Sequence, residues 1–333
     1  MNTNCGTLKI AVVIPCYKVK EHILKVIDGI GSEVYKIYVI DDKCPEGTGS
    51  FILSNSSDSR VKVIFSSHNQ GVGGAVINGY KAALKDGMDI IVKVDGDGQM
   101  DPSLIKYFVR PIISGDADYT KGNRFHTVEG VSSMPVVRLL GNAVLSFMTK
   151  FSSGYYKTFD PTNGYTAISS IALKMLPLEK ISNRYFFESD MLFRLNVIGA
   201  KVQDVPMDSV YGNEVSNLEI KKIMIPFLSG NVKNFIKRIF YNYFLRGFSI
   251  ASLELVLGSI LFSFGFVYGS YAWYESVVTD ITASSGTVML AGLPIILGVQ
   301  LLLSFIQADI ESQPTVSLTR MLRDDRTDEV RGS

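Results

Sequence analysis

Short apolar runs alternate with longer mixed stretches over the first two thirds of the chain. The apolar runs include "KIAVVIP", "KIYVIDD", "VKVIFS" and "DIIVKVD", and the stretches between and after them cover 18–30, 47–56, 73–86 and 102–113. Short β-branched runs are typical of strands, and the longer intervals have room for helices. The alternation predicts an α/β domain with a largely parallel sheet.

The same alternation continues with less regularity up to about residue 220. "DYTKGN", "GYTAISS" and "KVQDVPM" indicate further strands, and "ESDMLFRLNVIG" indicates a helix that starts with Glu188 and Asp190. We therefore expect a single domain over residues 1–220.

The segment 221–248 changes character, because it is basic and amphipathic. Up to Arg246 it contains six Lys and Arg residues and no acid, and its apolar residues recur at helical spacing, as in Val232, Ile236, Ile239 and Tyr243. A helix of this kind is expected to lie in the interface of an anionic membrane. A core-facing helix with a solvated basic side is the alternative.

Two apolar stretches follow, at Ile250–Trp273 and Val288–Ile306. Each is close to the roughly 20 residues that cross the hydrocarbon core of a bilayer as a helix. The connection between them carries acids but no Lys or Arg, whereas the flanking segments are basic. Together with the positive-inside rule, this predicts a two-helix transmembrane hairpin at 249–310 in the inner (plasma) membrane, a cytosolic tail at 311–333 and a cytosolic location for the domain at 1–220. Buried core helices are the alternative.

Composition supports a protein that contacts lipid. Of the 333 residues, 47% are hydrophobic, and the mean hydropathy of +0.20 is high for a purely soluble chain. The net charge of +1 argues against a nucleic-acid-binding protein. The three cysteines form no CxxC pair and do not stand at metal-ligand spacing from the histidines. The opening residues lack the pattern of a signal peptide, so Ile10–Ile14 is expected to be the first strand.

Acidic residues follow directly after the run "DIIVKV". Asp95 and Asp97 would emerge at the carboxyl end of a buried strand, which is where α/β sheets bind ligands. Carboxylates at this place, together with substrate phosphates, suit a hard divalent cation. An EF-hand is excluded, because Met100 and Lys106 stand where that loop needs Gly and Glu.

Taken together, the motifs resemble those of a known family. They are "VVIPCYK", "VIDDKCPEGT", "HNQGVGGAVINGYKAAL", "VDGDGQMDP", "KGNRF" and "DPTNGYTAIS". This succession is similar to family 2 glycosyltransferases of GT-A fold, and especially to polyprenyl-phosphate glycosyltransferases of the dolichol-phosphate mannose synthase type with C-terminal membrane helices. The motifs cover residues 8–220, and the predicted hairpin extends the likeness.

The resemblance implies a nucleotide-sugar site built from the first three motifs. Pro15 and Tyr17 would lie beside the nucleotide base, and Asp41 or Asp42 would accept hydrogen bonds from the base or the ribose. The likeness favours Asp41, although "DDKC" departs from the usual "DDGS" or "DDxS". Gly73 would lie at a helix start that suits a phosphate.

The resemblance also implies a metal site and an acceptor site. Asp95, Asp97 and Gln99 would hold Mg²⁺ or Mn²⁺ at the diphosphate, with Asp97 as the first ligand. Asp160 would lie near the acceptor, either as a general base or as an orienting group; a phosphate monoester needs no base, because it is already largely dianionic at pH 7. Residues expected at the lipid phosphate are Arg124, Arg138, Lys221 and Lys222.

The implied activity is the inverting transfer of a sugar, in our reading a UDP-hexose, to undecaprenyl or dolichyl phosphate at the cytosolic membrane face. The product would supply glycosylation on the other side, as in cell-wall or O-antigen synthesis. A processive polysaccharide synthase is disfavoured, because the single Trp273 does not form a QxxRW motif. A non-catalytic membrane subunit with a transferase-like fold is the rival from another class, and self-association is left open.

Overall fold

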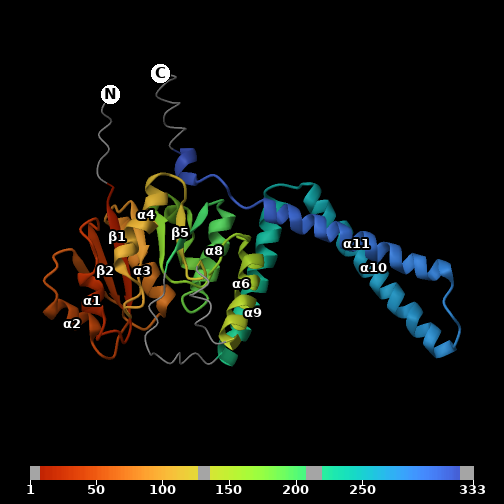
Figure 1. Ribbon diagram of the computed structural model, residues 1–333, viewed down its shortest axis with the longest axis horizontal. Helices are drawn as coiled ribbons and strands as arrows, with labels where there is room; N and C mark the ends of the chain where they lie inside the picture. The colour runs from red at the N-terminus through yellow and green to blue at the C-terminus, as the bar shows by residue number, and fades with distance from the viewer. Residues whose placement is uncertain (1–7, 127–135, 208–219, 323–333) are drawn as a thin grey trace, which may run out of the picture. The chain divides into compact units, whose positions relative to one another are not determined.

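The protein is described by a computed structural model that covers residues 8–126, 136–207 and 220–322. Its chain divides into two compact units, Met1–Phe235 with Pro314–Ser333, and Ile236–Gln313. The elements of the first unit alternate between strands and helices (Figure 1). In chain order they are β1 (Ile10–Cys16), α1 (Ile23–Asp28), β2 (Lys36–Asp41), α2 (Thr48–Asn55), β3 (Val61–Phe65), α3 (Val72–Lys85), β4 (Ile90–Lys93), a 3₁₀ turn (Pro102–Leu104), α4 (Ile105–Ile113), β5 (Tyr119–Asn123), α6 (Val136–Ser153), β6 (Thr166–Ser169), α7 (Ser170–Met175), a second 3₁₀ turn (Leu178–Lys180), α8 (Phe187–Val197), β7 (Val202–Pro206) and α9 (Ile220–Phe240).

Seven strands form one sheet in the order β3-β2-β1-β4-β6-β5-β7. All neighbours are parallel except that β6 runs antiparallel to both β4 and β5. The predicted α/β domain with a mostly parallel sheet is confirmed. The reversal of β6 was not predicted, because the composition of a four-residue strand carries no information about its direction.

Helices cover both faces of this sheet, and two apolar clusters fill the spaces between the layers. One cluster joins the sheet to α3, α7 and α8, and the other joins it to α1, α2 and α4. Alternate residues of β1 and β4 enter opposite clusters, as the two-residue period of a strand requires. The continuous apolar runs of the sequence therefore mark strands that are buried on both faces.

Helix α9 presents an unusual surface, because polar side chains lie among the buried residues of its inner face and several apolar side chains are exposed on its outer face. Asn231 and Asn234 are buried, and the Asn234 side chain donates a hydrogen bond of 3.0 Å to Asp190 in α8. Ile225 is 74% exposed, and Leu228 and Val232 are exposed along the same helix. Exposed apolar side chains of this kind are not expected on a helix whose outer face is in water.

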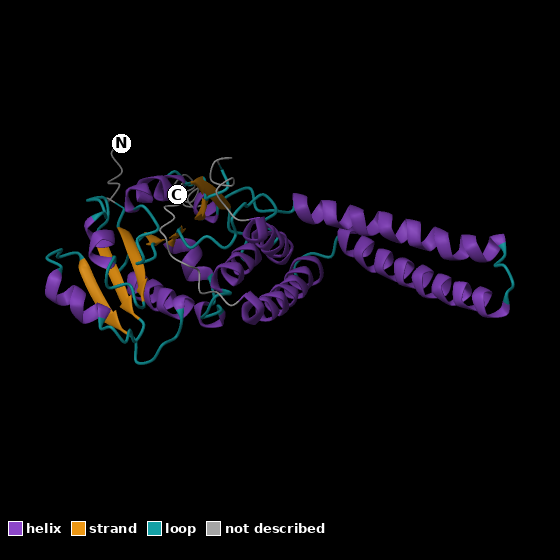
Figure 2. Ribbon diagram, turned by 60° about the horizontal axis from the view of Figure 1, so that its bottom comes forward, coloured by secondary structure: helices purple, strands orange, loops and turns teal. Residues whose placement is uncertain are grey.

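The second unit is a pair of long apolar helices, α10 (Ile250–Thr279) and α11 (Ser285–Glu311), which lie side by side (Figure 2). They extend beyond the predicted spans and leave a connection of only 280–284. Glycines allow the two backbones to approach closely: a Cβ added at Gly298 would lie 2.6 Å from the amide nitrogen of Phe262. Few of their residues are buried in the protein, and in the described chain these two helices are long and apolar enough to cross a membrane.

A buried ion pair within the second unit joins Arg238 of α9 to Asp309 of α11. The Arg238 guanidinium, which is fully buried, donates hydrogen bonds of 2.6 and 2.7 Å to the two carboxylate oxygens of Asp309. The Tyr243 hydroxyl donates a third, of 2.8 Å, to the same carboxylate. Arg238 is therefore enclosed by protein groups, unlike the solvated basic side that the alternative interpretation of this segment required.

The segment that follows α11 returns to the first unit and packs against it. Leu318 and Thr319 donate backbone hydrogen bonds of 2.8 and 3.0 Å to the carboxylate of Asp118, which is fully buried. The Thr319 hydroxyl adds another of 3.0 Å, and Ser317 donates to the carbonyl of Gly115. Asp118 precedes β5, so this contact lies at the sheet edge opposite to the carboxyl ends of β1 and β4.

Candidate active site

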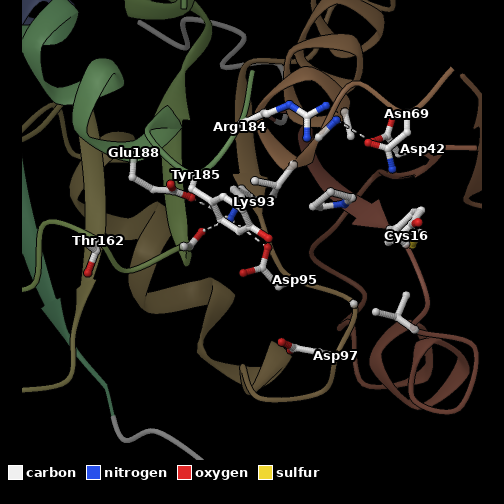
Figure 3. Close-up of a pocket in the computed structure, with 18 of the residues that line it drawn as sticks. Cys16, Asp42, Asn69, Lys93, Asp95, Asp97, Thr162, Arg184, Tyr185 and Glu188 are labelled. Atoms are coloured by element: carbon white, nitrogen blue, oxygen red, sulfur yellow. Dashed lines mark hydrogen bonds and ion pairs between the residues drawn. The ribbon is translucent and has the colours of Figure 1, made fainter. Parts of the chain in front are cut away.

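A cavity of about 900 Å³ lies at the carboxyl ends of β1, β2 and β4. This is the edge at which open α/β sheets bind their ligands. Most of the residues that line it come from the motifs of the sequence and from α8 and its preceding loop (Figure 3), and α6 and α9 each contribute one. The lining residues include Pro15, Cys16, Tyr17, Asp42, Asn69, Gly71, Lys93, Asp95, Asp97, Arg124, Thr162, Gly164, Arg184, Tyr185, Glu188 and Phe227.

Of the residues predicted to bind the nucleotide, Pro15, Tyr17 and Asp42 line this cavity. The carboxylate of Asp42 accepts backbone hydrogen bonds from Gln70 and Gly71, the latter at 2.8 Å, and so shapes the loop before α3. Asp41 is not among the lining residues; its carboxylate accepts 2.7 Å hydrogen bonds from the amides of Cys44 and Gly49. The two neighbouring acids thus fix two different loops beside the cavity.

Gly73 is the second residue of α3 and follows Gly71 and Val72, which line the cavity. Gly73 itself is not among the lining residues. A Cβ at this position would come within 2.5 Å of the carbonyl oxygen of Ser182. The glycine therefore allows α3 to pack closely against the loop before α8.

The acidic motif after β4 opens into the cavity, with Asp95 and Asp97 among its lining residues. Gln99 is not among the lining residues; its backbone amide donates a 3.0 Å hydrogen bond to the carboxylate of Asp97. Asp101 accepts a 2.9 Å hydrogen bond from the backbone amide of Ser103 and caps the following 3₁₀ turn. Two carboxylates and an amide are hard oxygen donors, which fits Mg²⁺ or Mn²⁺ when substrate phosphates supply further oxygens.

Lys93 is the residue of this site that sequence reasoning missed. It is the last residue of β4 and is fully buried, and its ammonium lies 2.8 Å from Asp95 and 3.4 Å from Glu188. Burial alone would lower the pKa of this ammonium, but the two carboxylates outweigh it and hold the pKa above its ordinary value. A lysine inside an otherwise apolar strand was the available signal, because a buried ammonium requires anionic partners.

A second buried lysine lies near the first. Lys121 in β5 donates to the carbonyl of Asn163, whereas Lys93 donates a 3.0 Å hydrogen bond to the carbonyl of the next residue, Gly164. Burial lowers the pKa of Lys121 to about 8, although Glu188 and Asp160 act in the opposite direction. The two lysines together hold the "DPTNGYT" loop against the sheet.

That loop carries Asp160, which forms a bidentate ion pair with Arg124. The Nε and Nη2 atoms of Arg124 donate hydrogen bonds of 2.6 and 2.9 Å to the two carboxylate oxygens. Asn163 donates to the same carboxylate at 3.1 Å. Asp160 is buried and is not among the lining residues of the cavity, whereas Arg124 is. The structure thus joins two residues that the sequence placed at the acceptor in separate roles.

The other cations predicted at the lipid phosphate cannot be placed in this way. Arg138 lies in α6, and Lys221 and Lys222 lie in α9, but their side chains are outside the described part of the chain. Further along α6, Val144 and Phe147 are described and are both exposed.

The fold and the cavity define an α/β enzyme with an acidic site at the carboxyl edge of its sheet. The sequence profile of glycosyl transferase family 2 matches residues 11–176. A UDP-N-acetylglucosamine–dolichyl-phosphate N-acetylglucosaminyltransferase of Methanococcus voltae is 32% identical over 66% of this chain and 92% of its own length. The chain belongs to glycosyl transferase family 2 and is a glycosyltransferase.

Other relatives and a solved structure agree with this assignment. An undecaprenyl-phosphate mannosyltransferase of Micrococcus luteus is 27% identical over 61% of this chain and 84% of its own length. The crystal structure of glucosyl-3-phosphoglycerate synthase from Mycobacterium tuberculosis with UDP has a TM-score of 0.52, covering 69% of this chain and 80% of its own at 18% identity. That likeness concerns the fold alone and confirms the predicted GT-A class.

Proposed function

We propose that this protein transfers a sugar from a nucleotide-diphosphate sugar to a polyprenyl phosphate at a membrane surface. The observation that carries the proposal is a cavity with paired carboxylates, Asp95 and Asp97, beside a cation, Arg124, in a chain that also has two membrane-length helices. The relatives from Methanococcus voltae and Micrococcus luteus, whose names specify dolichyl and undecaprenyl phosphate acceptors, support the same acceptor class.

The donor is proposed to bind along the carboxyl ends of β1 and β2. Pro15 and Tyr17 would contact the base. Asp42 would contact the donor rather than Asp41, because Asp42 lines the cavity and Asp41 does not. Asp41 and Gly73 would then act through the loops that they shape. We propose a UDP-hexose as the donor.

Asp97, Asp95 and Gln99 are the residues that would hold Mg²⁺ or Mn²⁺. The glucosyl-3-phosphoglycerate synthase of Mycobacterium tuberculosis has been solved with Mn²⁺ and UDP, which supports a divalent cation in this fold. Such a cation stabilises the negative charge that develops on a diphosphate leaving group. Within the described residues no group of three or more His, Cys, Asp and Glu side chains could hold a metal, so substrate oxygens would complete the coordination.

The acceptor needs orientation rather than deprotonation. A phosphate monoester has its second pKa near 6 and is largely dianionic at pH 7, so its oxygen can attack the anomeric carbon directly. The guanidinium of Arg124 would bind this phosphate, and Asp160 would hold the guanidinium in place. Attack opposite to the leaving diphosphate would invert the anomeric configuration. Arg138, Lys221 and Lys222 remain predictions for the same phosphate.

Membrane attachment is proposed through α9 and the hairpin. The outward apolar face of α9 and the exposed Val144 and Phe147 of α6 suit the boundary between headgroups and acyl chains. The charge pattern around the hairpin favours both termini and the catalytic domain on the cytosolic side of the inner membrane.

The direct test is transfer of label into lipid. Purified protein in detergent, with Mn²⁺ or Mg²⁺ and undecaprenyl phosphate, would receive a panel of labelled nucleotide sugars, and label in the organic phase would be counted. We expect transfer from one donor and loss of transfer with EDTA. Folded protein that labels no lipid from any donor would contradict the proposal.

A further inference from the structure

Lys93 lies in the candidate active site, and the proposed function gives it no role. Its side chain is buried at the wall of the cavity, and its ammonium lies next to Asp95 and Glu188 (Figure 3). The ammonium also donates a hydrogen bond to the carbonyl of Gly164. These partners come from the acidic motif, from α8 and from the "DPTNGYT" loop. One positive charge therefore connects three segments that meet at the cavity.

The packing around this ammonium is close. A Cβ added at Gly164 would lie 2.6 Å from both the Lys93 ammonium and an oxygen of Asp95. Two neighbours of the ammonium, Asp95 and Glu188, are carboxylates that line the cavity. The charge of Lys93 can therefore act on a ligand through these two carboxylates.

The charge of Lys93 opposes a divalent cation at Asp95. An ammonium 2.8 Å from this carboxylate partly neutralises it and repels any cation that approaches the same oxygens. Among the described residues, no cluster of three or more metal-binding side chains offsets this repulsion. A nucleotide diphosphate brings its own negative charge and oxygen donors, which can offset it.

We propose that Lys93 is a positioning residue that holds Asp95 and Glu188 in place. Its charge also weakens the binding of a divalent cation when no nucleotide is bound. The cation then binds mainly together with the nucleotide diphosphate. This inference rests on the proposed function, because it assumes a metal-dependent nucleotide-sugar site. It adds a binding order and a residue to that function.

The test measures Mn²⁺ binding directly, by the electron paramagnetic resonance signal of free Mn²⁺ in titrations of full-length protein in detergent. Wild type should bind Mn²⁺ weakly alone and tightly with UDP. Lys93→Met removes the repelling charge and should tighten binding of Mn²⁺ alone by at least about tenfold. The same variant should lose most of its transfer activity, mainly in kcat, because Asp95 and Glu188 are no longer held.

Lys121→Met is the matched control, since Lys121 is also a fully buried lysine but contacts Asn163 instead of Asp95. It should change the affinity for Mn²⁺ alone much less than Lys93→Met does. Equal tightening in the two variants would mean a general field effect and would overturn the role of Lys93. If Lys93→Met does not fold, Lys93→Gln, which can still donate to Gly164, should show the same tightening.

The outcomes separate this inference from the proposed function. Tight binding of Mn²⁺ by wild type with UDP, together with unchanged binding of Mn²⁺ alone by the Lys93 variants, overturns the inference only. Absence of Mn²⁺ binding by wild type even with UDP contradicts the metal-dependent function, and this inference with it.

Discussion

Asp97 is the residue on which the metal assignment depends most. Both Asp95 and Asp97 line the cavity, and the carboxylate of Asp95 is ion-paired with Lys93. We expect Asp97→Ala to lower the rate of sugar transfer by at least about a hundredfold, because charge on the leaving group is then poorly stabilised. The assay is label entering the organic phase from the active donor.

The control for this prediction is Asp101→Ser, which removes a nearby carboxylate but keeps an oxygen that can cap the 3₁₀ turn. It should retain most of the activity. Near-normal transfer by Asp97→Ala, in protein that remains inserted in the membrane, would remove Asp97 from the metal site.

Asp160 is predicted to orient Arg124 rather than to accept a proton. Asp160→Asn should slow transfer about 10- to 100-fold, because an amide holds the guanidinium less firmly than a bidentate carboxylate does. The acid limb of the pH–rate profile near pH 6 should persist, since it reflects ionisation of the acceptor phosphate.

Two results would count against this role of Asp160. Loss of the acid limb in Asp160→Asn would indicate a general base. Additive losses in the double variant with Arg124→Ala would indicate that the two residues act independently.

Lys121 makes the stability of the protein depend on pH in a defined direction. Burial lowers its pKa to about 8, whereas an unfolded lysine titrates at about 10.4. Between these values the unfolded chain binds more protons at this site, so the contribution of Lys121 to stability rises with pH. Below pH 8 the cost of burying the charge is present in full.

The thermal midpoint of wild type minus that of Lys121→Met should therefore increase between about pH 8 and 10, as followed by circular dichroism. The exposed Lys174 provides the comparison, and Lys174→Met should show no such trend. A flat difference for Lys121 would mean that this lysine is not perturbed in the folded protein.

At the scale of the elements, α9 is the helix whose two faces make opposite predictions. Changing Ile225 and Val232 together to Glu should raise the KM for polyprenyl phosphate and leave the thermal midpoint almost unchanged, because both side chains are exposed. The apolar change Asn231→Leu on the inner face should instead lower the free energy of unfolding by about 1–3 kcal/mol, and the thermal midpoint with it. The reason is that the buried Ser152 hydroxyl donates to the side-chain oxygen of Asn231 and would lose this acceptor. A destabilising effect of the two Glu changes would place this face against protein.

The sequence predicted these elements well where a period was strong, and less well where direction or ends mattered. The long apolar spans were identified, but their helices run further, to Thr279 and from Ser285, because polar residues beyond an apolar span can still be helical. The basic residues of α9 were predicted to lie in a membrane interface, with a solvated basic side as the alternative, yet Arg238 is buried against Asp309. Helical spacing alone does not say which charges find a partner.

At the scale of the whole molecule, the chain after α11 is predicted to stabilise the first unit. Removing residues 314–333 would leave the buried Asp118 carboxylate without three of its hydrogen-bond donors. We expect a loss of about 3 kcal/mol and a lower thermal midpoint. A chain that ends at Leu322 keeps these contacts and should retain the midpoint of wild type.

Asp118→Ala distinguishes this contact from a general effect of truncation. It should lower the midpoint by itself, and adding it to the truncation should cost little more, because both changes remove the same interaction. Unchanged stability of the truncated chain would mean that the returning segment contributes nothing to the first unit.

The sequence by itself determined which residues form strands, helices and the apolar hairpin, and it placed the acids after β4. These features follow from local periodicity and from short motifs, which depend only on neighbours along the chain. Asp95 and Asp97 could be named for this reason, whereas Pro15 and Tyr17 were named through the resemblance of their motif to a known family. The motifs also sufficed to predict the GT-A fold.

Only the tertiary structure decided which charged groups meet. Lys93 pairs with Glu188, Arg124 with Asp160, and Asp118 receives the backbone of Leu318 and Thr319, across separations of 36 to 201 residues. Local patterns report whether a residue is buried, but a buried charge is stabilised by a partner that any distant segment can supply. The roles of Lys93 and Asp160 therefore became visible only when those segments were brought together.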